Sequence, residues 1–176
     1  MLCTVFFAGC ENNEKDLPAF RKKQSGIEEA RMVVSYYSQN AKIKSKLTSP
    51  YMLRNQMDSA YIEFPRTLHV DFFNDSMRVE SQLDALYAKY YQTAGKVFLR
   101  DSVVVKNILK GDTLHCLELW WDQKAEKFYT DKPVRINKKG GTIINGTGME
   151  APQDFSGYSI FQITGPYGFA DKNLPK

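Results

Sequence analysis

The sequence predicts an all-β fold, and three observations support this prediction. Segment 86–144 contains one residue pattern twice, alternating apolar runs separated by polar turns continue across 30–165, and aromatic residues make up 13% of the chain. Alternation with a period of two is typical of strands with one covered face, and aromatic side chains favour strands. Because segment 30–165 has no sustained 3.6-residue period, we expect roughly a dozen strands joined by tight turns.

The internal repeat predicts stacked strand pairs. Tyr90 corresponds to Trp121 at an offset of 31 residues, whereas Phe98 corresponds to Phe128 at an offset of 30, so one residue has slipped within a turn. A unit of ~25–31 residues made only of strands and turns has an apolar face that it cannot bury alone, and stacking covers that face. The stacked faces either form a core or hold a guest, and this choice is the functional question that the sequence raises.

The first half of the domain alternates as clearly as the repeat. We expect a first strand at 33–37 and a second at 40–49, in which Lys42, Lys44 and Lys46 share one face. Lysines on an open face are typical of a protected sheet edge, and a basic lip for phosphate is the alternative interpretation. We expect Pro50 to close the second strand. Later strands are expected at 51–54, 61–65, 68–72, 77–81 and 155–165.

The N-terminal residues resemble an export signal. Residues 1–10, MLCTVFFAGC, are similar to a bacterial lipobox, in which Cys10 becomes the acylated first residue of the mature protein. The apolar run is short and no basic residue precedes it, which we interpret as a start codon placed too late; a hydrophobic N-terminal strand is the alternative. An acylated cysteine that carries several chains gives stable membrane anchorage. We expect 11–29 to be a polar tether, 30–165 the folded domain and 166–176 a C-terminal tail.

No group of residues has the spacing of a catalytic or metal site. His69 and His115 stand among alternating apolar residues without an accompanying metal, nucleophile or phosphate-loop motif, so we expect structural or surface roles for both. Cys116 is interpreted as a small buried side chain. We therefore expect no catalytic residue, no metal and no cofactor. The residues interpreted as turn residues are Asp101, Asp112, Asp122, Asp131, Gly111, Gly140, Gly141, Gly146 and Gly148.

Six segments, taken in order, resemble the LptC family of lipopolysaccharide export proteins. They are LTSPYMLRN (47–55), YIEFPRTLHVDFF (61–73), LDALYAKYY (83–91), GDTLHCLELWWD (111–122), FYTDKPVRI (128–136) and GTGMEAPQDFSGYSIFQITG (146–165). The resemblance covers about 30–165 and is nearest to the Bacteroidetes type, whose members are lipoproteins. It implies an open antiparallel β-jellyroll, a sheet folded over like a taco, that holds the acyl chains of lipopolysaccharide in an apolar groove.

The resemblance also implies partners and a location. The protein would lie in the periplasm, anchored to the inner membrane. Its N-terminal sheet edge would dock on LptF and LptG of the LptB-driven transporter, and its C-terminal edge would receive LptA by strand addition. We expect no nucleic-acid partner. The residues expected at the LptA-like edge are Tyr158, Ser159, Ile160, Phe161, Gln162, Ile163 and Thr164.

Alternating apolar positions are the candidates for the groove lining. They are Leu68, Val70, Phe72, Leu86, Ala88, Tyr90, Leu117, Leu119, Trp121 and Ile160. Two other functions remain open at this point. One is a lipoprotein that binds glycan or protein through a platform of Trp120, Trp121, Tyr90 and Tyr91; the other is a lipid-modifying β-barrel enzyme, which would need a polar, histidine-containing site. An elongated apolar trough between two sheet edges favours the carrier, and an aromatic patch on a closed sandwich favours the glycan binder.

Overall fold

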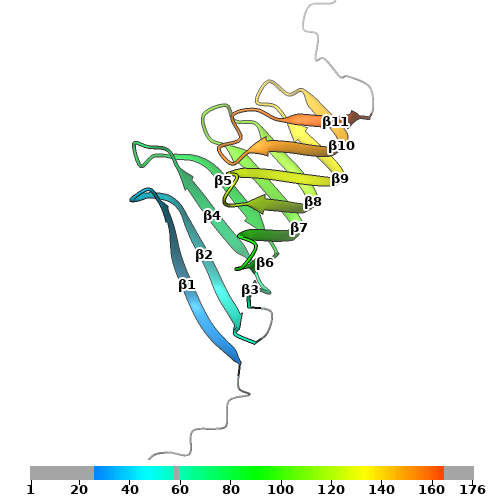
Figure 1. The fold of residues 1–176 in the computed structure, drawn as a ribbon. Coiled ribbons are helices and arrows are strands. Elements are labelled where there is room, and N and C mark those ends of the chain that lie inside the picture. The colour runs from blue at the N-terminus through cyan, green and yellow to red at the C-terminus, as the bar shows by residue number, and fades with distance from the viewer. Residues whose placement is uncertain (1–25, 58–59, 165–176) are drawn as a thin grey trace, which may run out of the picture.

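The computed structural model describes residues 26–57 and 60–164, which form one antiparallel sheet of eleven strands (Figure 1). The strands are β1 (Ile27–Gln39), β2 (Lys42–Asn55), β3 (Tyr61–Phe64), β4 (Leu68–Phe73), β5 (Val79–Ala85), β6 (Tyr87–Tyr91), β7 (Lys96–Asn107), β8 (Thr113–Asp122), β9 (Lys127–Asn137), β10 (Ile143–Pro152) and β11 (Ser159–Ile163). The all-β prediction is confirmed. The segment Ile27–Glu29, expected in the tether, forms the start of β1. Within the described ranges, no helix has the length and apolar character needed to cross a bilayer.

The sheet divides in two between β2 and β7. The first part of β2 pairs with β4, which continues through β5 to the second half of β7. The last part of β2 pairs with β3, which continues through β6 to the first half of β7. Beyond β7 the order is β8, β9, β10 and β11, whereas β1 pairs with β2 at the opposite end. β1 and β11 are therefore the two ends of the sheet.

The long strands bend at corresponding points. In β7 the pairing shifts between Arg100 and Val103, where Asp101 and Ser102 have φ of 63° and 51°. In β8 the shift falls between Cys116 and Trp120, and in β10 it falls at Gly148, whose φ is 73°. Extra residues in a strand interrupt the ladder and bend the strand. Because neighbouring strands bend together, the sheet is folded along its length.

The bend separates two walls. The β4–β5 wall contains β4, β5 and segments 42–49, 103–107, 113–116, 134–137 and 143–147 of the long strands. The β3–β6 wall contains β3, β6 and segments 51–55, 96–100, 118–122, 127–130 and 149–152. We call the space between the walls the lumen. Its residues come alternately from each strand, as the period-2 pattern predicts.

Pro50 does not end a strand, so this prediction is wrong. β2 continues through it, and Pro50 lies at the bend between the residues that pair with β4 and those that pair with β3. The opposing β1 residue, Met32, has a φ of 52° and is skipped in the pairing. A proline is tolerated there because its missing amide donor falls where the ladder is already interrupted.

The lysine-rich segment does not protect an edge, because β2 lies between β1 and β4. Lys42 and Lys44 instead lie 3.1 and 3.5 Å from the Asp75 carboxylate, at the turn between β4 and β5. The interpretation of Gly146 and Gly148 as turn residues is also wrong, since both lie within β10. The same holds for Asp101 and Asp131, which lie within β7 and β9. A Cβ on Gly146 would lie 2.6 Å from the Gln162 carbonyl oxygen, so glycine there permits close approach of β11.

Candidate functional site: the lumen

The lumen is apolar, and the described residues place no fully buried charged side chain in it. Its buried hydrophobic side chains come from both walls and form one cluster. The buried polar residues of the described chain are Ser45, Ser49, Ser81, Asn107, Thr130 and Gln153, and all of them are neutral. Burying an unpaired charge is far more costly than burying a hydroxyl or amide that is hydrogen-bonded. Such an interior suits hydrocarbon and excludes phosphate or carboxylate groups.

An aromatic cluster fills the middle of the lumen and joins the two walls. Phe72 of the β4–β5 wall contacts Trp121 of the β3–β6 wall edge-on, with ring centroids 5.0 Å apart. Phe72 also contacts Phe128 at 5.7 Å. All three side chains are almost completely buried. From this cluster towards β10, the space between the walls is filled by core side chains.

A loop closes the long open side of the lumen opposite the bend. This strap, residues 153–158, follows β10 and is held by both walls. Ser81 Oγ donates to the Gln153 carbonyl at 2.6 Å, Asn107 Nδ2 donates to the Asp154 carbonyl at 2.8 Å, and Trp121 Nε1 donates to Gln153 Oε1 at 3.2 Å. Phe155 points into the core and is 1% exposed. The strap therefore seals the half of the lumen that contains β7 to β10.

The other half of the lumen remains open. A cavity of about 160 Å³ lies between the β1–β2 hairpin and the β3–β6 wall. Its lining includes Ser35, Leu47, Met52, Tyr90 and Trp121. Burial raises the pKa of Tyr90, with a smaller effect from Tyr37, so its hydroxyl is neutral at physiological pH. The cavity therefore has apolar or uncharged walls, and the aromatic cluster forms its inner end.

The structure places most of the predicted lining residues in the lumen. Leu68, Val70, Phe72, Ala88, Leu119 and Trp121 are buried there, and Tyr90 and Ile160 pack on the same cluster while partly exposed. Of these, Tyr90 and Trp121 line the open cavity. Sequence reasoning missed Leu47 and Met52, although Leu47 already alternated with the lysines of its strand. It also missed Ser35 and Ser45, because small polar residues carry no signal of an apolar lining.

Leu86 and Leu117 do not share the burial of their neighbours, so the predicted alternation is wrong at both positions. Leu86 is 50% exposed and Leu117 is 70% exposed. Leu86 lies at the break between β5 and β6, where its amide donates to the Asp101 carbonyl. Leu117 lies in the β8 bulge between Cys116 and Trp120. Bulges of this kind reset the inward and outward alternation. Both side chains consequently lie on the line of the bend.

The aromatic doublets are divided between the two faces of the β3–β6 wall. Tyr90 and Trp121 face the lumen, whereas Tyr91 and Trp120 do not belong to the buried cluster. The rings of Tyr91 and Trp120 stack with centroids 6.0 Å apart. The four residues therefore do not form one platform as the glycan alternative expected. Only Tyr91 and Trp120 lie together outside the lumen.

The histidines and the cysteine lie in separate environments. His69 Nδ1 is 2.7 Å from Asp84 Oδ1 and its Nε2 is 3.1 Å from Asp71 Oδ1. Burial alone would lower the pKa of His69, but the hydrogen bonds and charges of Asp84 and Asp71 outweigh it and raise this pKa. Burial raises the pKa of the Cys116 thiol to about 12, so the thiol stays protonated. Among the described residues, no three histidine, cysteine or acidic side chains are grouped as a metal ion would require.

The two ends of the sheet are unpaired edges. β1 pairs with β2 along almost its full length, and among the described strands it has no partner on its other side. β11 pairs with β10 through residues 159–163 and is likewise the last strand. Of the residues expected at this edge, Tyr158 precedes β11 and Thr164 follows it. Tyr158 stacks on Phe155 of the strap, with ring centroids 5.6 Å apart.

Comparison with known proteins identifies one family. The family described as lipopolysaccharide-assembly, LptC-related, matches residues 12–154. This range contains β1 to β10 and ends within the strap. A search of curated proteins gave no match.

Proposed function

Because the chain belongs to the LptC-related family of lipopolysaccharide-assembly proteins, we propose that it relays lipopolysaccharide by holding the acyl chains in its lumen. Family membership assigns the chain to lipopolysaccharide transport. The proposal goes further in naming the acyl chains as the bound part and the lumen as their site. The observation that carries it is an uncharged apolar lumen, closed towards β10 and open at the β1–β2 end.

The open cavity is the proposed place where an acyl chain first enters the lumen. Ligand sites in proteins usually have volumes of ~300–1,000 Å³, so a cavity of about 160 Å³ accepts part of an acyl chain in this conformation. Further loading requires β1 and segment 42–49 of β2 to move away from the β3–β6 wall. β1 pairs with β2 alone among the described strands, so it can move without breaking the pairing with a second strand. Lipid would therefore enter beside β1 and advance towards the aromatic cluster.

A relay of this kind needs no catalytic group. Moving an acyl chain from water to an apolar site is favourable by about 0.8 kcal/mol per methylene, but a chain that leaves a bilayer only exchanges one apolar environment for another. The net gain in the lumen is therefore small, which lets the lipid move on. Extraction from the membrane would be driven by the LptB-powered transporter, and this protein would act as a passive carrier.

The two sheet edges are the proposed partner sites. The free edge of β1 would dock on LptF and LptG, and the free edge of β11 would receive LptA, so that the folded sheet continues at both ends. Thr164 N donates to the Asn145 carbonyl of β10. Because every second amide of a strand points to the same side, the amides of Ile160 and Gln162 also face β10. The amides of Ser159, Phe161 and Ile163 are then left for a partner.

The location is proposed from the family and the N-terminal residues together. We place the protein in the periplasm at the inner membrane, held by a lipid on Cys10. Residues 1–25 lie outside the described residues, so this assignment depends on the lipobox-like sequence. Mass spectrometry of the mature protein tests it: an acylated Cys10 at the N-terminus supports the anchor, and an unmodified Cys10 within a longer chain rejects it.

Photo-crosslinking in cells tests the lumen as the lipid site. A photoreactive side chain at Tyr90 is expected to capture lipopolysaccharide while the exporter is active. Leu119 is buried in the closed half and is expected to capture less, and Val104, on the opposite wall facing away from the cluster, is the negative control. Capture by Val104 equal to that by Tyr90, or capture of protein alone at Tyr90, would reject the lumen.

Proline substitution tests the β11 edge. Phe161→Pro removes an amide from the free side of β11 and is expected to weaken co-purification of LptA without unfolding the domain. Gln162→Pro is the matched variant, since it removes an amide that faces β10 and should loosen β11 itself. Undiminished LptA binding by Phe161→Pro would exclude this edge as the docking site.

A further inference from the structure

The outer face of the β3–β6 wall carries a continuous band of aromatic side chains. The strand register places Phe98 opposite Trp120, and Trp120 opposite Tyr129, so the three rings lie on three neighbouring strands. The ring centroids are 5.0 Å apart for Phe98 and Trp120, and 6.4 Å apart for Trp120 and Tyr129, whose planes differ by 10°. Tyr91 extends the band to β6 by stacking on Trp120 with a plane difference of 26°.

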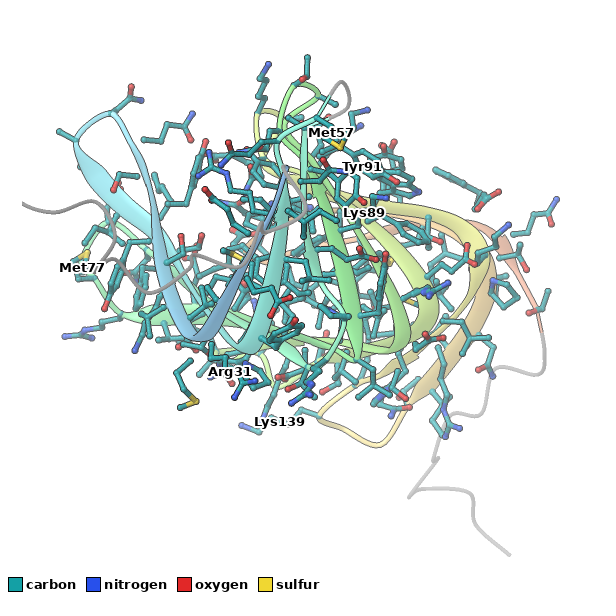
Figure 2. All side chains as sticks on the ribbon, turned by 90° about the horizontal axis from the view of Figure 1, so that it is seen from below. Arg31, Met57, Met77, Lys89, Tyr91 and Lys139 are labelled. Atoms are coloured by element: carbon teal, nitrogen blue, oxygen red, sulfur yellow. The ribbon has the colours of Figure 1, made fainter. Side chains whose placement is uncertain are left out.

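Charged side chains of both signs are interleaved with these rings. Lys89 places its ammonium 3.7 Å from the centroid of Tyr61 and 5.6 Å from that of Tyr91. Figure 2 labels Lys89 and Tyr91, which lie close together. On the other side of the band, Lys96 Nζ lies 3.2 Å from Tyr129 Oη and 3.6 Å from the Asp122 carboxylate. Ammonium groups near ring faces are held by the negative potential of the π-system. The band therefore presents ring surfaces, hydrogen-bond donors and hydrogen-bond acceptors together.

The outer face of the other wall differs at the corresponding positions. On β7, β8 and β9 the register there aligns Val104, His115 and Arg135 in place of the three rings. These are the same three strands on the other side of the bend. These three strands therefore pack without a row of aromatic side chains on the outer face of the β4–β5 wall. Strand packing alone does not explain the row on the β3–β6 wall, which is better explained by ligand binding.

The composition of the band favours a carbohydrate over a bilayer or a nucleic acid. Carboxylates lie beside it at Asp122 and Glu150, where each is within 4 Å of a lysine ammonium. Because these pairs cancel most of the charge of the band, it offers little net attraction for an anionic membrane surface or a phosphate backbone. A sugar has hydroxyl groups that pair with either sign of charge, and its C–H groups, which carry partial positive charge, suit the negative faces of aromatic rings.

The position of the band connects it with the lumen. Tyr91 and Lys96 flank one turn at the rim of the β3–β6 wall, and Asp122 and Lys127 flank the next. The acyl chains proposed to lie in the lumen end in a headgroup that the uncharged interior excludes. Gln123, in the second of these turns, lines the open cavity, so a saccharide attached to that headgroup would leave the cavity over this rim. The rings on the outer side then lie next to its path.

We propose that the outer face of the β3–β6 wall, centred on Trp120, binds the oligosaccharide of the same lipopolysaccharide molecule whose acyl chains occupy the lumen. This inference depends on the proposed function for the choice of ligand. It adds a second site, on the opposite side of one wall, for the sugar part of the cargo. The two sites together distinguish a glycosylated lipid from a simple fatty acid or phospholipid.

Affinity measurements with two ligands test the inference on the full chain. Trp120→Ala is expected to weaken binding of oligosaccharide-bearing lipopolysaccharide by about five- to tenfold and to leave binding of lipid A, which lacks the oligosaccharide, unchanged. Trp120→Phe keeps a ring and should recover most of the affinity. His115→Ala on the same strand is the matched control, because it changes the outer face of the other wall.

The outcomes separate this inference from the proposed function. If Trp120→Ala binds each of the two ligands as tightly as the wild type does, the sugar site is overturned and the lumen assignment stays intact. A parallel loss of lipid A affinity in Trp120→Ala also overturns it, since the ring would then act on the fold or the lumen. Failure of lipid A to bind wild type rejects the lumen. In that case the deacylated oligosaccharide is titrated alone, and broadening or shifting of the Trp120 indole NMR signal supports the sugar site, while an unchanged signal rejects it.

Discussion

The two halves of the lumen are built from the same alternating strands but differ in how they are packed. Towards β10, Phe72, Trp121 and Phe128 join the walls, and the strap closes the open side. Beside β1, a cavity remains, and Leu47, Met52 and Tyr90 of its lining are only partly buried. The difference indicates that stability and binding are assigned to different halves. The closed half maintains the fold, and the open half can change without unfolding it.

The largest expected difference between the halves is in stability. Trp121→Ala removes the side chain that contacts both the opposite wall and the strap, and should lower the free energy of unfolding by about 3–5 kcal/mol. Leu47→Ala, in the partly buried lining beside β1, should lower it by about 1–2 kcal/mol, because it leaves less of a new cavity. Urea denaturation followed by tryptophan fluorescence or circular dichroism measures both. Equal losses would contradict the division into a closed and an open half.

A second expectation concerns the last two strands. Gly148 has φ of 73°, and a Cβ there would lie 2.7 Å from the Phe161 ring, so Gly148→Ala should destabilise the protein by about 1–2 kcal/mol. Amide hydrogen exchange should increase mainly in β10 and β11. Gly140→Ala is the matched control, since nothing lies within 4 Å of its added Cβ. If Gly140→Ala proved as harmful as Gly148→Ala, backbone strain at the bend would be the wrong explanation.

Filling the open cavity should reduce lipid binding more than stability. Ser35→Trp places a large side chain at the cavity wall and should weaken binding of lipid A by about tenfold, which corresponds to ~1.4 kcal/mol. Val34→Trp on the neighbouring position of β1 is the control, because alternate side chains of a strand face opposite sides. The two thermal melting temperatures should stay close. Comparable affinities of the two variants would place the lipid elsewhere.

The smallest expected effect is a pH dependence at His69, which lies outside the lumen. Since Asp84 and Asp71 raise its pKa in the folded state, the stabilisation is fully present below the ordinary value of 6.5 and is lost as the pH rises through the folded-state pKa. His69 is partly exposed, so solvent screening limits the effect to a few tenths of a kcal/mol. His69→Gln should remove this part of the pH dependence from urea titrations at pH 5 to 9. An unchanged profile would show that the His69–Asp84 pair does not affect stability.

The sequence predicts where the strands lie, and which of their side chains face the lumen, better than it predicts where the strands bend. Leu68, Val70 and Phe72 alternate in one unbroken strand, and period-2 reasoning placed all three in the lumen. Leu117 alternates with Leu119 in the same way, but a bulge reverses its side. At Asp101 and Ser102 the bend uses positive φ without glycine, so composition gave no warning. Backbone strain of this kind persists only because neighbouring strands bend at the same level.

The doublets Tyr90–Tyr91 and Trp120–Trp121 show a related limit. Period-2 alternation requires one member of each pair to face the lumen and the other to face away, but it does not say which. Tertiary packing decides: Trp121 meets Phe72 across the lumen, and Trp120 stacks with Tyr129 on the outside. The strap was also beyond sequence reasoning, because its hydrogen bonds join Ser81 and Asn107 to residues far along the chain.

Methionine methyl NMR during a lipid A titration tests the central claim most directly, because the methionines report on separate places. Met52 lines the open cavity and Met149 is fully buried in the closed half, whereas Met32, Met57 and Met77 are exposed. We expect the Met52 methyl signal to shift first and most, with Met149 changing less and the three exposed methyls staying in place. Shifts confined to the exposed methyls, with Met52 unchanged at saturation, would contradict binding of acyl chains in the lumen.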